Sequence, residues 1–473
     1  MSRMTTLSEY TTVQGGYAYK SADFLKSGKF RVLKIKNIRF GYIDYSETDF
    51  IDEKLSEKTK DWMVKPKDIL ISMTGSGPNA PASLVGRVAR VGRNEPISFI
   101  NQRIGKIIVN DKIHPDFIYY LLSQKASQEY FVNNSTGSAN QVNINANTIL
   151  SLEVPKISFD ESKKIADILN CFDEKIQLNT QINQTLEQIA QAIFKSWFVD
   201  FDPVLAKADA LAQGKTQAEA ELAAQQIISG KTPEELTALS QTHPDQYAEL
   251  AEIARAFPCE FEEIDGFEVP RGWGYQTVGS LINVVDYVAN GSFATLKENV
   301  TLLSEPSYAI YVRTTDFNSG FSKELRYVDK SAYDFLEKSV LIGNEVIISN
   351  VGDVGTVFRS PSWLGMPMTL GSNAIALKNY DIPHYLYLHF ISYKGQQDIS
   401  SIITGSAQLK FNKTNFRSLQ ILIPNNKTLS IFEKIVNPIF ERIDKNMNKN
   451  LKLSEIRDLL LPKLLNGDLI CQQ

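Results

Sequence analysis

The stretch KIQLNTQINQTL (residues 175–186) lies within a run with the apolar periodicity of a long helix, 162–198, yet it puts Asn179 and Asn183 on the apolar stripe. A second helical run, 429–465, has Asn446 and Asn450 at the same heptad positions, 267 residues later. An unpaired amide in a packed seam costs about 1–3 kcal/mol. If the two helices pack antiparallel, Asn179 meets Asn450 and Asn183 meets Asn446, and the paired amides fix the register.

An alternative interpretation leaves these asparagines in solvent and runs the seam through Ile182 and Ile189. The shared spacing of the asparagines in both helices favours the pairing.

The chain contains a long internal repeat. TGSA at 136–139 recurs at 404–407, HPDFIYYLL (114–122) matches IPHYLYLHF (382–390), and KPKDILISMTGSG (65–77) resembles IGNEVIISNVGD (342–353). Each copy combines short β-branched strands with a short aromatic helix, and a long helix follows it. The sequence therefore predicts an α/β (α+β) fold in which two similar mixed domains are joined by two helices in an antiparallel coiled coil with pseudo-two-fold symmetry.

The same repeat divides the chain into five parts. An Ala/Glu/Gln-rich segment interrupts the repeat and is expected to form two surface helices. The expected parts are a first mixed domain (1–158), a first helical region (159–202), the acidic helical insert or linker (203–265), a second mixed domain (266–424) and a second helical region (425–473).

Charge is unevenly distributed along the chain. The net charge is −4, but residues 202–265 hold thirteen acidic and four basic residues, so the remainder carries +5. A basic remainder favours a polyanionic partner. The first residues lack the apolar core of a signal peptide and no long apolar run spans a membrane, so a cytoplasmic protein is expected. Scattered histidines and the distant Cys171, Cys259 and Cys471 predict neither a metal site nor a disulfide.

Catalytic motifs are not found in the sequence. GKT occurs at 214–216 and 230–232, but a phosphate-binding loop needs a glycine five residues earlier, where Asp209 and Gln225 stand. NPIF (437–440) lacks the second proline of a methyltransferase loop and lies in a helix seam. We therefore predict a non-enzyme that binds no cofactor itself.

The remaining candidates are groups that bind DNA. Cations and amides at strand ends, and hydroxyl-rich turns, can contact phosphates or base edges. The candidate DNA-binding residues are Lys20, Arg31, Lys34, Lys36, Asn37, Ser72, Thr74, Ser76, Thr136, Ser138, Asn140, Gln141, Tyr311, Arg313, Thr314, Ser349, Asn350, Thr404, Ser406, Gln408 and Lys410.

Together these segments resemble the specificity subunit of Type I restriction–modification systems. TLEQIAQAIFKSWFVDFDPV (185–204) and EIRDLLLPKLLNGDL (455–469) resemble the ends of that family's two helical regions, VPRGW (269–273) resembles the start of a second recognition domain, and the TGSA segments resemble its Thr-Gly-Ser turn. The second TGSA is followed by Gln-Leu-Lys where the first has Asn-Gln-Val, so base contacts cannot be transferred from one copy to the other.

The resemblance implies a subunit without catalysis that holds double-stranded DNA and recruits two methyltransferase subunits and two restriction subunits. S-adenosylmethionine, ATP and Mg are then expected on those partners. Two alternatives stay open: a fused methyltransferase–specificity chain, for which two repeats leave no room, and a DNA-binding regulator or architectural protein without enzyme partners.

Overall fold

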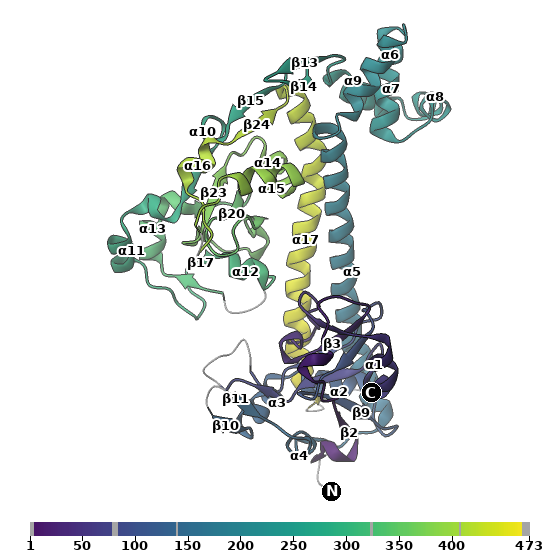
Figure 1. Cartoon of the computed structure of the whole chain (residues 1–473), viewed down its shortest axis with the longest axis vertical. Coiled ribbons are helices and arrows are strands. Elements are labelled where there is room, and N and C mark those ends of the chain that lie inside the picture. Colours follow the sequence, from purple (N-terminus) through teal and green to yellow (C-terminus); the bar gives the residue numbers. More distant parts are fainter. Residues whose placement is uncertain (1–3, 78–83, 139–140, 322–324, 406–407, 466–473) are drawn as a thin grey trace. The chain divides into compact units, whose positions relative to one another are not determined.

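The computed structural model describes residues 4–77, 84–138, 141–321, 325–405 and 408–465 (Figure 1). The chain divides into two compact units, one of residues 1–177 with 452–473 and the other of residues 178–451. The chain therefore passes from one unit to the other only within its two longest helices.

The first unit contains small, mainly antiparallel sheets. Its strands are β1 (Met4–Thr6), β2 (Thr11–Gly15), β3 (Phe30–Leu33), β4 (Asp49–Ile51), β5 (Ile69–Ser72), β6 (Thr74–Gly75), β7 (Val88–Arg90), β8 (Ser98–Ile100), β9 (Ile104–Val109), β10 (Thr136–Ser138), β11 (Gln141–Asn143) and β12 (Glu153–Pro155). The central sheet has the order β2-β9-β5-β7, and the others are β4-β3-β8, β10-β11-β6 and β1-β12. Strand β5 is buried throughout, as expected of an apolar strand between two others.

The second unit repeats this plan. Its strands are β13 (Phe261–Ile264), β14 (Phe267–Pro270), β15 (Gly274–Thr277), β16 (Asn283–Asp286), β17 (Ala309–Val312), β18 (Tyr327–Val328), β19 (Val340–Leu341), β20 (Val346–Ser349), β21 (Val357–Arg359), β22 (Met368–Leu370), β23 (Ala374–Lys378) and β24 (Gln420–Ile423). The order β16-β23-β20-β21 matches β2-β9-β5-β7, and β15-β24 matches β1-β12. Strand β17 pairs antiparallel with β18 and parallel with β22, as β3 does with β4 and β8. The predicted duplication and mixed fold are therefore confirmed.

Short helices complete the two domains. They are α1 (Glu53–Lys58), α2 (Pro115–Leu122), α3 (Lys125–Asn133) and α4 (Ala146–Leu150) in the first, and α10 (Val278–Leu281), α11 (Phe293–Asn299), α12 (Thr314–Asn318), α13 (Lys330–Phe335), α14 (Pro383–Ile391), α15 (Tyr393–Ser401) and α16 (Lys413–Ser418) in the second. Helices α2 and α14 are the matching aromatic helices. Each begins with a proline, whose missing amide is no loss in a first turn.

The two long helices are α5 (Phe159–Phe198) and α17 (Asn426–Leu465). Within the second unit, Ala190 and Trp197 of α5 are buried in one core with Phe432 and Val436 of α17. Higher residue numbers in α5 face lower numbers in α17, so the helices are antiparallel there, as the heptad pattern predicts.

The acidic segment forms four helices, and the expectation of two was wrong. They are α6 (Asp202–Ala212), α7 (Gln217–Ser229), α8 (Pro233–Thr242) and α9 (Pro244–Ala256). Prolines at the starts of α8 and α9, and glycines after α6 and α7, divide what composition alone makes one helical stretch. The threonines of both GKT triplets, Thr216 and Thr232, cap helices α7 and α8 in capping boxes.

Candidate nucleic-acid interface

In the first domain, the central strand, the start of β9 and a hairpin meet at Met73. The backbone amide of Met73 donates to the carbonyl oxygen of Arg103 (2.9 Å), and the Met73 carbonyl oxygen accepts from the amide of Ile144 (3.0 Å). The next residues form β6, which pairs with β11 of the β10–β11 hairpin. The predicted Thr-Gly-Ser turn is therefore a hairpin strand held at the end of the central sheet.

The second domain builds the same junction at Asn350. The amide of Asn350 donates to the carbonyl oxygen of Asn373 (3.1 Å), and its carbonyl oxygen accepts from the amide of Phe411 (3.2 Å). Isolated bridges join Val351 and Thr404 to Lys410, where the first domain has its hairpin. The second Thr-Gly-Ser segment therefore also lies beside the end of its central strand.

The register of the central sheets shows which residues are equivalent. Ser72 of β5 lies opposite Ile104 of β9, and Ser349 of β20 lies opposite Ala374 of β23. The main-chain junction is kept while its side chains change. The equivalent pairs are Met73 and Asn350, Arg103 and Asn373, Thr74 and Val351, and Asn143 and Lys410.

Several predicted DNA-binding residues have exposed side chains. In the hairpin regions these residues are polar or basic, which suits contact with a nucleic acid. Lys36 is exposed but forms an ion pair with Glu47 at 2.9 Å. The exposed candidates are Lys20, Lys36, Thr136, Gln141, Thr404, Gln408 and Lys410.

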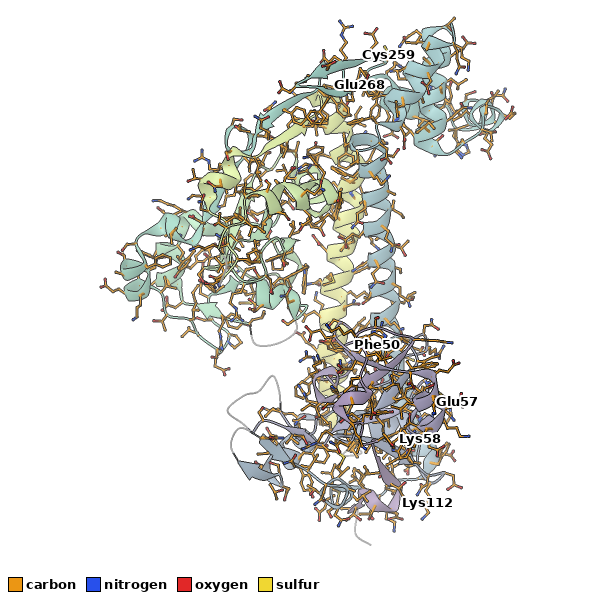
Figure 2. All side chains as sticks on the ribbon, in the orientation of Figure 1. Phe50, Glu57, Lys58, Lys112, Cys259 and Glu268 are labelled. Carbon is orange, nitrogen blue, oxygen red and sulfur yellow. The ribbon has the colours of Figure 1, made fainter. Side chains whose placement is uncertain are left out.

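Three predicted cations are half-buried and bonded within their own domains. Arg31 donates to the Thr48 hydroxyl (2.7 Å), and its guanidinium lies 5.0 Å from the centre of the Phe50 ring, which is labelled in Figure 2. Lys34 forms a 2.6 Å ion pair with Asp49. These contacts hold the two cations in place at the strand end. A DNA phosphate that bound either cation would therefore compete with its partner inside the domain.

Arg313 is held in the same way. It forms an ion pair with Asp316 at 2.5 Å, and the Asp316 side chain is only 1% exposed. Removing Arg313 would leave a buried carboxylate without this partner, so its substitution affects the fold as well as any DNA contact.

Seven of the predicted DNA-binding residues have buried side chains. The prediction that these side chains contact DNA directly is therefore wrong. Tyr311 packs edge-to-face on Tyr287 within the core, and burial raises the pKa of Tyr311. Asn37 accepts from the amide of Lys34 and donates to two carbonyl oxygens of its own loop. The Ser72 hydroxyl accepts from the amide of Arg87. The buried candidates are Asn37, Ser72, Thr74, Ser76, Tyr311, Thr314 and Ser349.

The side chains of the four remaining candidates are either half-buried or outside the described residues. Asn350 is half-buried at the junction. Asn140 and Ser406, and the side chain of Ser138, lie outside the described residues.

One exposed arginine at the junction was missed. The Arg103 guanidinium Nη1 donates to the Thr74 hydroxyl and to the Asn143 amide oxygen, both at 3.1 Å. The Thr74 hydroxyl itself donates to the same Asn143 oxygen at 2.7 Å. Arg103 precedes β9 in an ordinary turn, so its sequence neighbourhood carries no distinguishing pattern; only strand pairing brings it to Thr74.

The asparagines in the helix pair lie where the heptads predict. Asn179 Nδ2 donates to Asn450 Oδ1 (2.7 Å), and Asn446 Nδ2 donates to Asn183 Oδ1 (2.8 Å). Asn179, Asn183 and Asn446 are buried, whereas Ile189 is 44% exposed. The pairing is confirmed and the solvent-facing alternative is wrong.

Each domain is fastened to its own long helix by an equivalent arginine. Arg90 ends β7 and lies opposite Ile69, and Arg359 ends β21 and lies opposite Val346. Arg90 Nη2 contacts Asp173 of α5 at 3.3 Å. Arg359 Nη2 contacts Asp444 of α17 at 2.8 Å, and its guanidinium lies 4.6 Å from the centre of the Phe440 ring.

The Arg90–Asp173 contact of the first domain, which we call an arginine clamp like its counterpart Arg359–Asp444, includes further charges. Asp173 also forms an ion pair with Arg457 of α17 at 2.6 Å. Arg90 also bonds Asp116 of α2 at 2.8 Å. Burial alone would raise the pKa of Asp116, but the hydrogen bond from Asn170 and the charge of Arg90 lower it, so the carboxyl stays ionised.

Within the described ranges, no cluster of three or more His, Cys, Asp or Glu could hold a metal ion. No helix of the described chain combines the length and apolarity needed to span a membrane. Cys171 and Cys259 are not in a disulfide, and Cys471 lies outside the described residues.

The fold and the repeated junction define a class of protein: a duplicated chain in which two similar mixed α/β domains are each followed by a long helix. A family model described as the Type I restriction modification DNA specificity domain matches residues 3–188 and again residues 270–456. The chain belongs to this family of Type I restriction–modification specificity subunits and carries two copies of its domain, which confirms the resemblance.

The chain is also similar to individual proteins. The chain is 39% identical over 370 residues to the Type I restriction enzyme HindI specificity subunit of Haemophilus influenzae, covering 75% of this chain and 77% of the relative. It is 25% identical over 445 residues to the MjaIX specificity subunit of Methanocaldococcus jannaschii, covering 92% and 85%. A crystal structure of an S subunit from M. genitalium aligns over 98% of this chain and 95% of its own, with 16% identity and a TM-score of 0.46.

Proposed function

We propose that the two domains of this specificity subunit read the two halves of a bipartite double-stranded DNA target, and that the chain catalyses nothing itself. The observation that carries the proposal is the repeated junction. Both domains keep its main-chain hydrogen bonds, at Met73 and at Asn350, while the neighbouring side chains differ. A common frame with changed side chains is what two readers of different sequences need.

The proposed partners are two methyltransferase subunits and, through them, two restriction subunits in the cytoplasm. S-adenosylmethionine, ATP and Mg would be bound by those partners. The support is the family, whose relatives are named as specificity subunits of restriction enzymes. The long helices are the proposed docking region for the methyltransferase subunits, because one long helix follows each of the two recognition domains.

The helices are also proposed to set the gap between the half-sites. The chain crosses between its two units only within α5 and α17. Each of these helices has 40 residues, which span roughly 60 Å at ~1.5 Å per residue. Two readers of the major groove on one side of a duplex lie about 34–36 Å apart, so a short run of base pairs between the half-sites is left unread.

The test is methyl transfer from labelled S-adenosylmethionine to host-type DNA by the purified chain, by a co-expressed methyltransferase subunit, and by both together. Transfer is expected only with both present. Transfer by the chain alone would contradict the non-catalytic role. Specific DNA binding without association with any methyltransferase would favour the regulator or architectural alternative.

A further inference from the structure

We propose that Arg103 reads a guanine in the half-site of the first domain, an inference that rests on the proposed DNA recognition. Arg103 is exposed at the junction, next to the β10–β11 hairpin. Its backbone is fixed because its carbonyl oxygen accepts from the amide of Met73 (2.9 Å). The side chain is therefore mounted on the end of the central sheet.

The Arg103 guanidinium is oriented by hydrogen bonds to the side chains of Thr74 and Asn143. Buried Thr74 has a single hydroxyl hydrogen, which it donates to Asn143 Oδ1 (2.7 Å), so its lone pairs face Arg103. Arg103 Nη1 donates to both oxygens at 3.1 Å, and this uses both of its hydrogens. Among the described residues, neither Nε nor Nη2 of Arg103 has an acceptor. These two parallel donors form the fork that matches O6 and N7 of guanine in the major groove.

The charge of Arg103 is also uncompensated. Across the described chain it forms no ion pair, unlike Arg313 with Asp316 or Lys34 with Asp49. Its two partners are neutral oxygens. The positive charge and the fork are therefore both available to DNA.

The second domain distinguishes a base contact from a phosphate contact. At the same positions it has Asn373, Val351 and Lys410 in place of Arg103, Thr74 and Asn143. The phosphate backbone is the same in both half-sites, so a phosphate contact has no reason to change while the main-chain frame is kept. A changed set is expected if the position reads a base, since asparagine pairs with adenine as arginine does with guanine.

The experiment uses the complete methyltransferase complex and a duplex that carries its mapped target. Each guanine of the first half-site is replaced in turn by 7-deazaguanine, which lacks the N7 acceptor. For the unaltered complex, one replacement should weaken binding roughly 10- to 100-fold, and in Arg103→Ala that same replacement should have no further effect. Arg103→Lys keeps the charge but not the planar fork, and should reduce the discrimination. Exposed Arg93→Ala, in the same domain, is the matched control and should keep it.

Thr74 is assigned as a positioning residue. Thr74→Val should reduce discrimination at that guanine without changing binding to unrelated DNA, and Thr74→Ser should restore it. The inference is overturned if Arg103→Ala weakens target and unrelated DNA equally with a salt slope lower by about one, which marks a phosphate contact. It is also overturned if every 7-deazaguanine replacement weakens binding by the Arg103→Ala complex as much as it weakens binding by the unaltered complex. Failure of the unaltered complex to prefer any sequence would instead contradict the proposed function.

Discussion

The Asn179 amide donates a 2.7 Å hydrogen bond to Asn450 across the two long helices, and the Asn446 amide donates a 2.8 Å hydrogen bond to Asn183. Two pairs of amides in an otherwise apolar seam make slippage costly, because any other register places them against hydrocarbon. The seam is therefore specified by position as well as by apolarity.

Single and paired leucine substitutions should separate these two effects. Asn446→Leu leaves the buried Asn183 without its principal partner and should lower the free energy of unfolding by about 1–3 kcal/mol. Asn446→Leu with Asn183→Leu should recover that loss, and all four asparagines changed to leucine should raise the melting temperature or loosen the register. Denaturant unfolding of each variant is the measurement, and a clear loss of stability in the fourfold variant counts against the seam.

The arginine clamp of the second domain should contribute measurably to stability. Arg359→Ala removes the ion pair with Asp444 and the contact with the Phe440 ring, both on α17. We expect a loss of about 1–3 kcal/mol in the free energy of unfolding. Exposed Arg442→Ala on the same helix is the control and should stay within about 0.5 kcal/mol. Equal stability of the two variants would mean that the clamp does not fasten the domain.

Stability should fall in mild acid because of His389. Burial lowers the pKa of His389 from 6.5 to about 4, with Lys394 lowering it further and Asp398 opposing. The unfolded chain therefore takes up a proton near pH 6.5 that the folded chain refuses until about pH 4. This contribution is complete above pH 6.5 and is lost as the pH falls towards 4, by up to about 3 kcal/mol.

The measurement is the free energy of unfolding against pH for the unaltered chain and for His389→Gln, which cannot titrate. The difference in slope should be confined to pH 4–6.5. Identical slopes would show that His389 does not titrate abnormally.

The long helices should act as a ruler. Four residues inserted after Gln177 in α5 and after Lys452 in α17 lie between the Asp173–Arg457 and Asn179–Asn450 pairs, so both sets of contacts are kept. Four residues are close to one helical turn and add about 6 Å, or roughly two base pairs of gap. Methylation mapping should show unchanged half-sites with wider spacing; altered bases at the old spacing would refute the ruler.

The sequence predicts the duplication and the asparagine pairing because both depend on spacing, which a chain displays directly. It does not predict which side of a turn faces solvent. Ser72 and Ser349 match as a repeat, but both are buried, since a repeat copies interior positions as faithfully as surface ones. Arg103 was missed for a related reason: Thr74 and Asn143 become its neighbours only through strand pairing. In the acidic insert, composition indicated helices, but their number depends on capping at Thr216 and Thr232.

The most direct test of the account is methylation-sensitive sequencing of host DNA with and without this gene. The account predicts one bipartite, non-palindromic motif with a gap of fixed length, methylated in the presence of the gene and unmethylated in its absence. The two half-sites should differ, because the two junctions present different side chains. A continuous motif, or a methylation pattern that does not change when the gene is removed, would contradict it.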